Sequence, residues 1–247
     1  MTPELPGQAL MIEASAPDAV AGKKSLRPAP ASLRMQILST EHGSLLATRS
    51  MTWEESFHRA QMFLTALSGA VVALALVSQA TSFGSGFATF ALVLLPVVLF
   101  LGLTTFIRLV AINHDEYRWV IGMNRIRAAY LELAPELEPY FVTGYHDDWK
   151  GVMRTAGWSD FPTLRGYVTT PAVVCVIDGV VAAVIVFLAA DQLHASTPIA
   201  ATLGVVAFVA WNVALSQYTT RGYRKSERAH RSLSPTPIGE GAPQPVE

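Results

Sequence analysis

The chain has 247 residues, of which 51% are hydrophobic and only 15% are charged, and its formal net charge is −1. Soluble domains usually carry about 25% charged residues, so this composition excludes an ordinary soluble domain and indicates a polytopic membrane protein. The near-neutral charge gives no basis for a nucleic-acid partner. The single cysteine, Cys175, excludes an intramolecular disulfide.

Four long apolar runs follow one another along the chain, at residues 60–81, 87–112, 168–190 and 198–217. Each is long enough to cross a bilayer as a helix, which needs about 20 residues. The connections 82–86 and 191–197 contain no Lys or Arg, and the 18 Lys and Arg residues all fall on the other side of the predicted membrane, with Arg108 near the inner end of the second run. This asymmetry predicts four spans with both termini in the cytoplasm.

The predicted fold is an all-α integral membrane protein, with four transmembrane helices in two antiparallel hairpins and a cytoplasmic helical layer. The first 20 residues lack a basic start and a long apolar core, so we expect no cleavable signal peptide. The abundance of Ala and Val suggests a bacterial inner membrane. The predicted segments are a disordered N-terminus (1–31), an amphipathic juxtamembrane segment (32–59), hairpin 1 (60–112), a cytoplasmic helical segment continuing from helix 2 (113–167), hairpin 2 (168–217) and a tail that is basic and then disordered from Ser232 (218–247).

Local signals predict where several helices begin and end. Thr52 is a candidate N-cap for the helix of the first span, and segment 32–59 before it is either a surface-lying amphipathic helix or a weakly structured linker. Prolines follow Thr170 and Thr197, the predicted starts of spans three and four. Span two is expected to continue as a helix to Pro135. Its apolar stripe beyond the membrane needs a partner, which is either segment 32–59 or the same helix of another subunit.

Asp178 is the most unusual side chain, because it lies near the middle of the third run. An Asp there costs about 2.5–3.5 kcal/mol on insertion, so it should face the bundle interior and be paired, hydrated or protonated. One hypothesis is an ion or proton site, and the other is structural hydrogen bonding to a neighbouring helix. Arg108 and Asn212 are the other candidates for an intramembrane polar site, although Arg108 is expected to extend to the lipid headgroups.

Small residues at four-residue spacing predict close helix packing. The candidates are Gly69, Ala73, Cys175, Gly179, Ala183 and Gly204. The basic run after span four, Arg221, Arg224, Lys225 and Arg228, is expected to contact anionic lipid headgroups; the alternative is docking of an acidic protein.

The sequence contains no glycine-rich phosphate loop, nucleophile turn or zinc-protease motif, so we expect neither an enzyme nor a cofactor. The clusters His114-Asp115-Glu116 and His146-Asp147-Asp148 contain metal-ligand residue types, but solvated surface charge is the simpler interpretation. We therefore expect a non-enzymatic scaffold or regulatory protein that acts through its cytoplasmic layer. Its expected partners are the lipid bilayer and either further copies of itself or another membrane protein. The alternative is an oligomeric ion or proton channel with Asp178 facing the pore.

Overall fold

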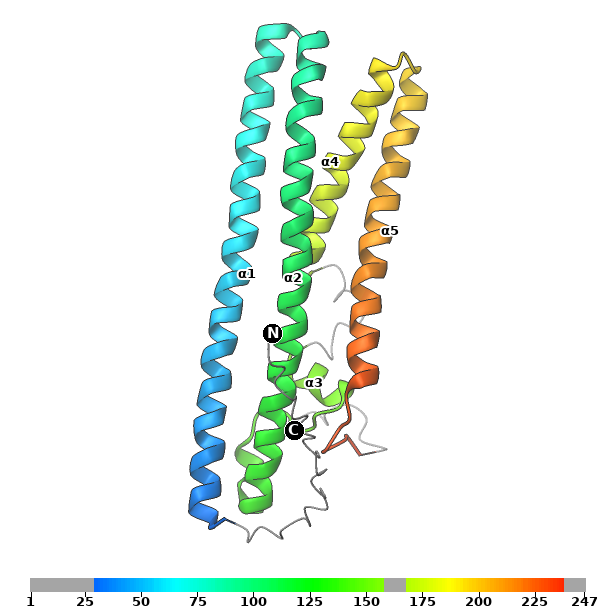
Figure 1. Cartoon of the computed structure of the whole chain (residues 1–247). Helices are drawn as coiled ribbons and strands as arrows, with labels where there is room; N and C mark the ends of the chain where they lie inside the picture. The colour runs from blue at the N-terminus through cyan, green and yellow to red at the C-terminus, as the bar shows by residue number, and fades with distance from the viewer. Residues whose placement is uncertain (1–28, 158–167, 238–247) are drawn as a thin grey trace, which may run out of the picture.

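The computed structural model describes residues 29–157 and 168–237, and within these residues it contains helices, turns and loops but no strand. Figure 1 shows four long helices that run roughly along one axis. The elements are α1 (Ala31–Thr81), α2 (Ser85–Leu133), the 3₁₀ helix η1 (Pro135–Tyr140), α3 (Trp149–Thr155), α4 (Thr170–Gln192) and α5 (Thr197–Ala229). Most of the predicted N-terminal segment, the end of the predicted cytoplasmic segment (158–167) and the last ten residues lie outside the described residues.

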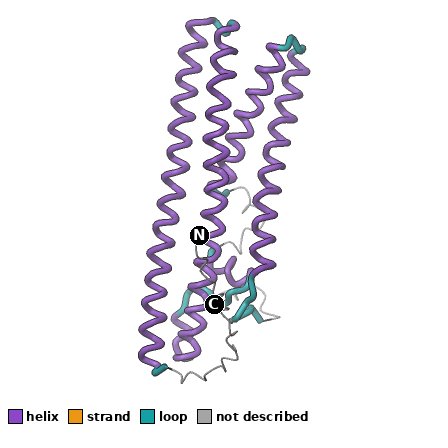
Figure 2. The backbone as a smooth tube through the Cα atoms, viewed as in Figure 1, coloured by secondary structure: helices purple, strands orange, loops and turns teal. Residues whose placement is uncertain are grey.

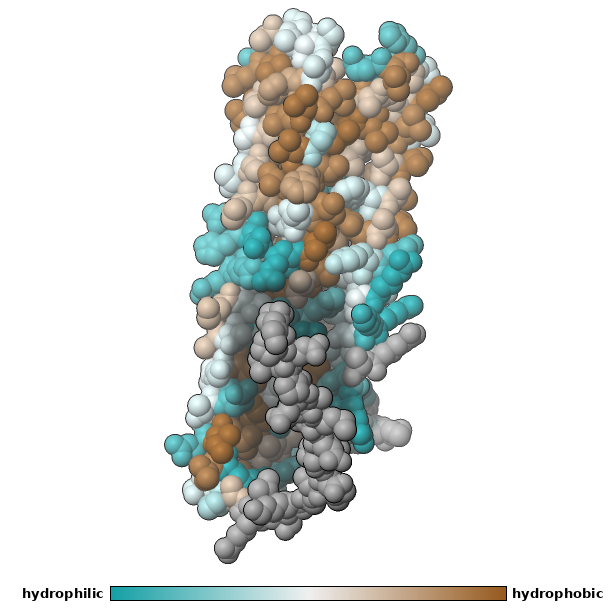
Figure 3. Space-filling view, viewed as in Figure 1, coloured by the Kyte–Doolittle hydropathy of each residue, from teal (hydrophilic) through white to brown (hydrophobic). Residues whose placement is uncertain are grey.

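The four long helices are each apolar enough, over at least 18 residues, to cross a membrane. The short connections α1–α2 and α4–α5 lie at one end of the molecule, and α1 begins and α5 ends toward the other (Figures 1 and 2). Figure 3 shows that apolar side chains dominate the end with the short connections. We call residues 60–112 and 168–217 the apolar half, and residues 31–59, 113–157 and 218–237 the polar half.

Helix α2 is the central element, because it packs extensively against both α1 and α4, whereas α1–α4 and α2–α5 contacts are few. Helix α4 also packs along α5. A buried apolar cluster joins α1, α2 and α4 in the apolar half, and its members include Phe63, Leu95, Phe106, Leu109 and Val174. A second cluster lies in the polar half and is built from Tyr117, Val120, Ile121, Met123 and Val152.

The second cluster shows what covers the apolar stripe of α2. Trp149 and Met153 of α3 and Leu45 of α1 pack against it. The sequence left two candidates for the partner of this stripe, and the structure supplies segment 32–59 of the same chain together with α3. As predicted, α2 is a single helix of 49 residues that ends just before Pro135.

One predicted helix boundary is wrong. Thr52 does not begin a helix, because α1 is continuous from Ala31 to Thr81. The Thr52 hydroxyl donates a hydrogen bond to the Thr48 carbonyl at 2.8 Å instead of capping. Local cap signals are weak compared with the packing of residues 31–59 along α2, so the helix continues through Thr52. The starts predicted at Thr170 and Thr197, each with a following proline, are confirmed.

Candidate functional site

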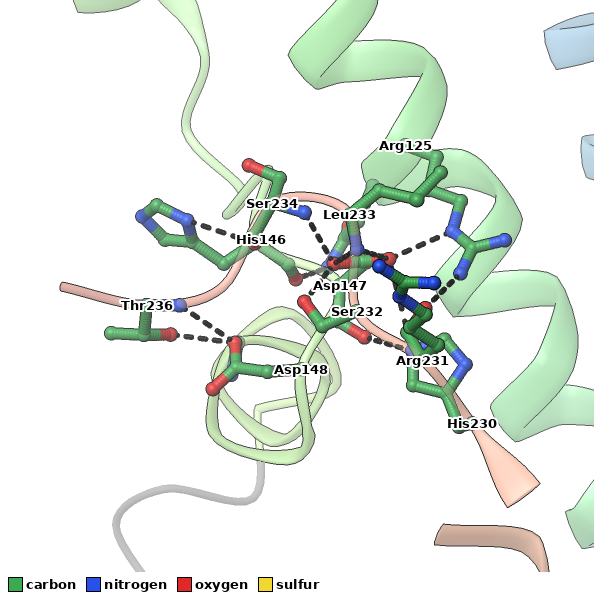
Figure 4. Close-up of polar contacts among 12 residues, drawn as sticks. Arg125, His146, Asp147, Asp148, His230, Arg231, Ser232, Leu233, Ser234 and Thr236 are labelled. Atoms are coloured by element: carbon green, nitrogen blue, oxygen red, sulfur yellow. Dashed lines mark hydrogen bonds and ion pairs between the residues drawn. The ribbon is translucent and has the colours of Figure 1, made fainter. Parts of the chain in front are cut away.

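The most highly connected polar group of the described chain is the carboxylate of Asp147, which lies in the loop between η1 and α3 and is fully buried. Figure 4 shows it surrounded by donors from the segment that follows α5. The backbone N–H groups of Leu233 and Ser234 donate to it at 3.0 and 2.9 Å. The Ser232 hydroxyl donates as well, and the Arg125 guanidinium of α2 donates at 2.7 Å.

Backbone groups around Asp147 also take part in this attachment. Its N–H donates to the Ser234 carbonyl at 3.1 Å, and its carbonyl lies 2.8 Å from His230 Nε2. The second guanidinium arm of Arg125 donates to the carbonyl of Arg231 at 2.9 Å. Residues 230–236 therefore form an ordered strap, and we call this segment the C-terminal strap.

Asp148 holds the far end of the strap. It is the N-cap of α3, where its side chain accepts from the Gly151 N–H at 3.2 Å. The same oxygen accepts from the hydroxyl and the N–H of Thr236 at 2.7 and 3.2 Å (Figure 4). One carboxylate thus begins a helix and binds the strap.

The loop that carries Asp147 and Asp148 is held in place by contacts with α2 and α3. The fully buried Asn124 of α2 donates from its amide to the His146 carbonyl at 2.7 Å. Gly151 is required at its position, because a Cβ there would lie 2.4 Å from the His146 carbonyl oxygen. The loop therefore approaches α3 more closely than any other residue at position 151 permits.

The Asp147 carboxylate is held in its charged form. Burial by itself raises the pKa of this carboxyl, but the hydrogen bonds from Ser232, Leu233, Arg125 and Ser234 outweigh that effect and bring the pKa far below its usual range. The strap is consequently bound by an ionised group at neutral pH.

Two predictions from the sequence are corrected by this site. The cluster His146-Asp147-Asp148 is not solvated surface charge, since Asp147 is fully buried and His146 is nearly so. The tail is not disordered from Ser232 onward, because residues 232–236 make the hydrogen bonds above. One local signal was usable, namely Asp148 as the N-cap of a short helix. The strap, however, is more than 80 positions away along the chain, and no local pattern connects the two.

Two ion pairs join α1 to α2, one at the boundary between the apolar and polar halves and one within the polar half. Arg108 of α2 donates two hydrogen bonds to the Glu55 carboxylate, at 2.8 and 2.7 Å, and Arg49 pairs with Glu116 at 2.7 Å. The hydrogen bonds from Arg108 hold the pKa of Glu55 at about 2. Arg108 thus pairs with α1 within the chain, and its predicted extension to the lipid headgroups stays a prediction.

Asp178 of α4 lies inside the bundle and faces α2. Its side chain is fully buried, and neither carboxyl oxygen has a hydrogen-bond partner among the described residues. The space that it fills exists because residue 102 is glycine: a Cβ on Gly102 would lie 1.8 Å from Asp178 Oδ1. Asp178 therefore packs directly on the α2 backbone, and Arg108, which is engaged by Glu55, does not neutralise it.

Asn212 belongs to a different contact, between α4 and α5. Its amide oxygen lies 3.4 Å from the Cys175 thiol, and its amide nitrogen donates to the Phe208 carbonyl at 2.9 Å. A Cβ on Gly179 would meet Asn212 at 2.4 Å, and one on Gly204 would meet the Ala183 carbonyl oxygen at 3.1 Å. Of the predicted packing residues, Cys175, Gly179, Ala183 and Gly204 thus do lie at a close helix contact.

Gly69 does not have the predicted role within one chain. It is exposed, and no atom lies within 4 Å of where its Cβ would be. The buried side of α1 instead carries Phe63 and Ala70, while Ala73 is only partly buried. The spacing of Gly69 and Ala73 thus places both on a helix, but Gly69 makes no close helix contact among the described residues.

The basic run lies on the last turns of α5. Arg221, Arg224 and Lys225 are on this helix, and no ion pair or hydrogen bond joins them to another described residue. The side chain of Arg228 lies outside the described residues. Among the described residues no group of three His, Cys, Asp or Glu side chains is arranged to hold a metal ion.

No known protein family, curated protein or solved structure matches this chain.

Proposed function

We propose that this protein is a non-enzymatic scaffold or regulatory protein of a bacterial inner membrane, which acts through a cytoplasmic helical layer. In this proposal the apolar half forms two antiparallel transmembrane hairpins, α1–α2 and α4–α5. The polar half forms the cytoplasmic layer, with both chain termini on that side. The distribution of Lys and Arg supports this orientation, and so do the two short connections at the apolar end.

The observation that carries the proposal is the C-terminal strap. It is held by charged and backbone hydrogen bonds to Asp147, Asp148 and Arg125, and little apolar surface is buried with it: Leu233 is 72% exposed. Contacts of this kind are directional and can be exchanged for equivalent contacts to another chain. The strap is therefore suited to be displaced by a partner, which makes it a means of regulation rather than a part of the core.

A groove beside the strap offers a place for such a partner. A cavity of about 450 Å³ lies between α2 and the strap, and its lining includes Arg125, Ala129, Glu132, Leu233 and Ser234. A peptide that enters this groove would meet Arg125 and the donors of the strap together. The proposal is that partner binding here and strap docking are coupled.

A cross-linking experiment in native membranes tests the proposal. A photoreactive residue is placed at Ala129, and adducts are compared between the otherwise wild-type chain and Asp147→Asn, which weakens strap docking. Asp115→Asn is the matched control, because the only ion pair of Asp115 with a described residue is with Arg118, at 3.6 Å on the surface. Adducts that change with Asp147→Asn and not with the control support the proposal. The same adducts in all three chains, or none, contradict it.

The channel alternative remains a prediction and has a separate test. Asp178 is buried within one chain, where a pore shared between subunits would not reach it without rearrangement. Ion and proton flux through liposomes that contain the wild type or Asp178→Asn would settle the matter. Flux in the wild type that the variant alters would favour the channel over the scaffold.

A further inference from the structure

A cavity of about 300 Å³ lies between α2 and α5, at the boundary between the apolar and polar halves. It is lined by His114, Ala214, Tyr218, Arg221, Gly222 and Lys225. None of these lining residues is acidic. The nearest acid in sequence, Asp115, pairs with Arg118. The cavity is therefore electropositive and combines two cations with two ring groups that can donate hydrogen bonds.

Three polar groups of this cavity have no polar partner among the described residues. Arg221 and Lys225 form no ion pair or hydrogen bond with the other described residues. His114 Nε2 is buried without a hydrogen-bond partner among them. A buried donor or acceptor left unpaired costs about 1–3 kcal/mol, so a ligand that pairs with it relieves a real penalty.

Gly222 shapes the cavity. A Cβ at this position would lie 2.5 Å from the His114 ring, so only glycine allows the ring to come this close to α5. The His114 ring also contacts Tyr223, whose ring packs edge-on to it with 4.5 Å between the centroids. The imidazole is thus fixed in place beside the two cations.

The position of the cavity indicates where its ligand would come from. Tyr218 directly follows the last apolar run, and Arg221 and Lys225 lie within about two helical turns of its end, or roughly 11 Å at 1.5 Å per residue. Under the membrane placement proposed above, this level is that of the lipid headgroups on the cytoplasmic side. The inference uses that placement and does not depend on the scaffold role.

We propose that this cavity binds one phosphate group, with Arg221 and Lys225 supplying the charge and His114 and Tyr218 supplying hydrogen bonds. The ligand chemistry is an anionic phosphate ester or free phosphate, and a lipid headgroup is one source of it. This differs from diffuse attraction of a basic tail to a membrane, because it requires a defined set of residues. Arg224 belongs to the same basic run but does not line the cavity.

The test uses the full chain in detergent micelles and measures binding of three probes: inorganic phosphate, phosphatidylglycerol and phosphatidylcholine. The variants are Arg221→Gln, the cavity-filling Gly222→Leu and the matched control Arg224→Gln, which removes the same charge from the same helix. Loss of one charge-assisted contact is expected to weaken binding about tenfold. Arg221→Gln should show that loss for phosphatidylglycerol, and Arg224→Gln should stay within about twofold of the wild type.

The three probes separate the two sources of phosphate. Tight binding of phosphatidylglycerol with weak binding of the other two identifies a lipid headgroup site. Binding of inorganic phosphate that is equally sensitive to Arg221→Gln identifies a site for a soluble anion. No saturable binding of any probe, or equal effects of Arg221→Gln and Arg224→Gln, overturns the proposal. Gly222→Leu should abolish binding without removing a charge; if it disturbs helical content by circular dichroism, Arg221→Gln alone decides. These outcomes leave the cross-linking test of the scaffold role unaffected.

Discussion

Asp147 shows how one side chain can fix a distant part of the chain. It is fully buried, yet its neighbours are almost all donors, and three of them come from the strap. A buried charge is tolerated only when its hydrogen-bonding capacity is used. The same requirement means that the strap cannot leave without exposing the carboxylate to water or to a new donor.

Replacing Asp147 by Asn should release the strap. The amide keeps the shape but loses the charge, and its NH₂ group faces donors where the carboxylate had an acceptor oxygen. Each hydrogen bond to a charged group contributes about 1.5–3 kcal/mol, and the strap donates three of them to Asp147. Hydrogen exchange of the Leu233 and Ser234 amides should therefore speed up by at least about 100-fold. Asp115→Asn should leave these amides unchanged, and an equal acceleration in that control would mean a global effect rather than loss of the strap contact.

The close contact between Gly102 and Asp178 can be tested by changing the size of either side chain. Gly102→Ala places a methyl group within the volume of the Asp178 carboxyl, and overpacking of this kind costs about 1–3 kcal/mol. Unfolding in a series of denaturing detergent mixtures should show that loss. Adding Asp178→Ala should restore stability, whereas Asp178→Asn, which keeps the volume, should not.

Gly69→Ala is the matched control for the Gly102 substitution. Nothing lies near the Gly69 position, so the methyl group is accommodated and the helix gains roughly 1 kcal/mol or less from the loss of a flexible residue. Destabilisation of similar size by both substitutions would contradict the contact between Gly102 and Asp178.

At the scale of elements, α1 and α2 are joined by ion pairs as well as by apolar packing. Two ion pairs connect the helices: Glu55 of α1 pairs with Arg108 of α2, and Arg49 of α1 pairs with Glu116 of α2. These contacts keep residues 31–59 packed against α2 rather than lying on the membrane surface.

The Glu55 contact gives a pH dependence whose sign follows from its lowered pKa. Its pKa falls from 4.5 to about 2 in the folded protein, so the contact stabilises the α1–α2 packing fully above about pH 4.5 and is lost as the pH falls toward 2. Glu55→Gln should remove this dependence. The measurement is hydrogen exchange of residues 45–59 between pH 6 and 3, corrected for intrinsic rates. Glu54→Gln, at an exposed neighbour without an ion pair, should retain the wild-type profile.

The helices were predictable from sequence to a larger extent than their contacts. Apolar runs and prolines determine where α2, α4 and α5 lie, because hydrophobic length and proline geometry are local properties. Which side of α1 faces inward is not local, since lipid and protein interior are equally apolar. The small-residue spacing at Gly69 therefore carried no sign that its face lies outside the bundle, and the same spacing at Gly179 and Gly204 carried no sign that those faces lie inside it.

For the whole molecule, the orientation proposed above makes a direct labelling prediction. In a Cys175→Ser background, single cysteines at Gly84 and Ala195, in the two short connections, should react with a membrane-impermeant maleimide in intact cells. A cysteine at Met35 of α1 should react only after the membrane is opened. The reverse pattern would invert the topology, and reaction of all three in intact cells would contradict the membrane placement.

The way the strap returns to α2 has a mechanical consequence. The α4–α5 pair meets α2 mainly through α4 in the apolar half, because α2–α5 contacts are few. The strap adds a second attachment in the polar half, through Arg125 and the Asp147 loop. Two separated attachments fix an angle, whereas one leaves a pivot. Without the strap, the polar half of α5 would be held to α2 mainly through the contact of His114 with Gly222 and Tyr223, so an event at a single carboxylate would change how firmly the α4–α5 pair keeps its tilt.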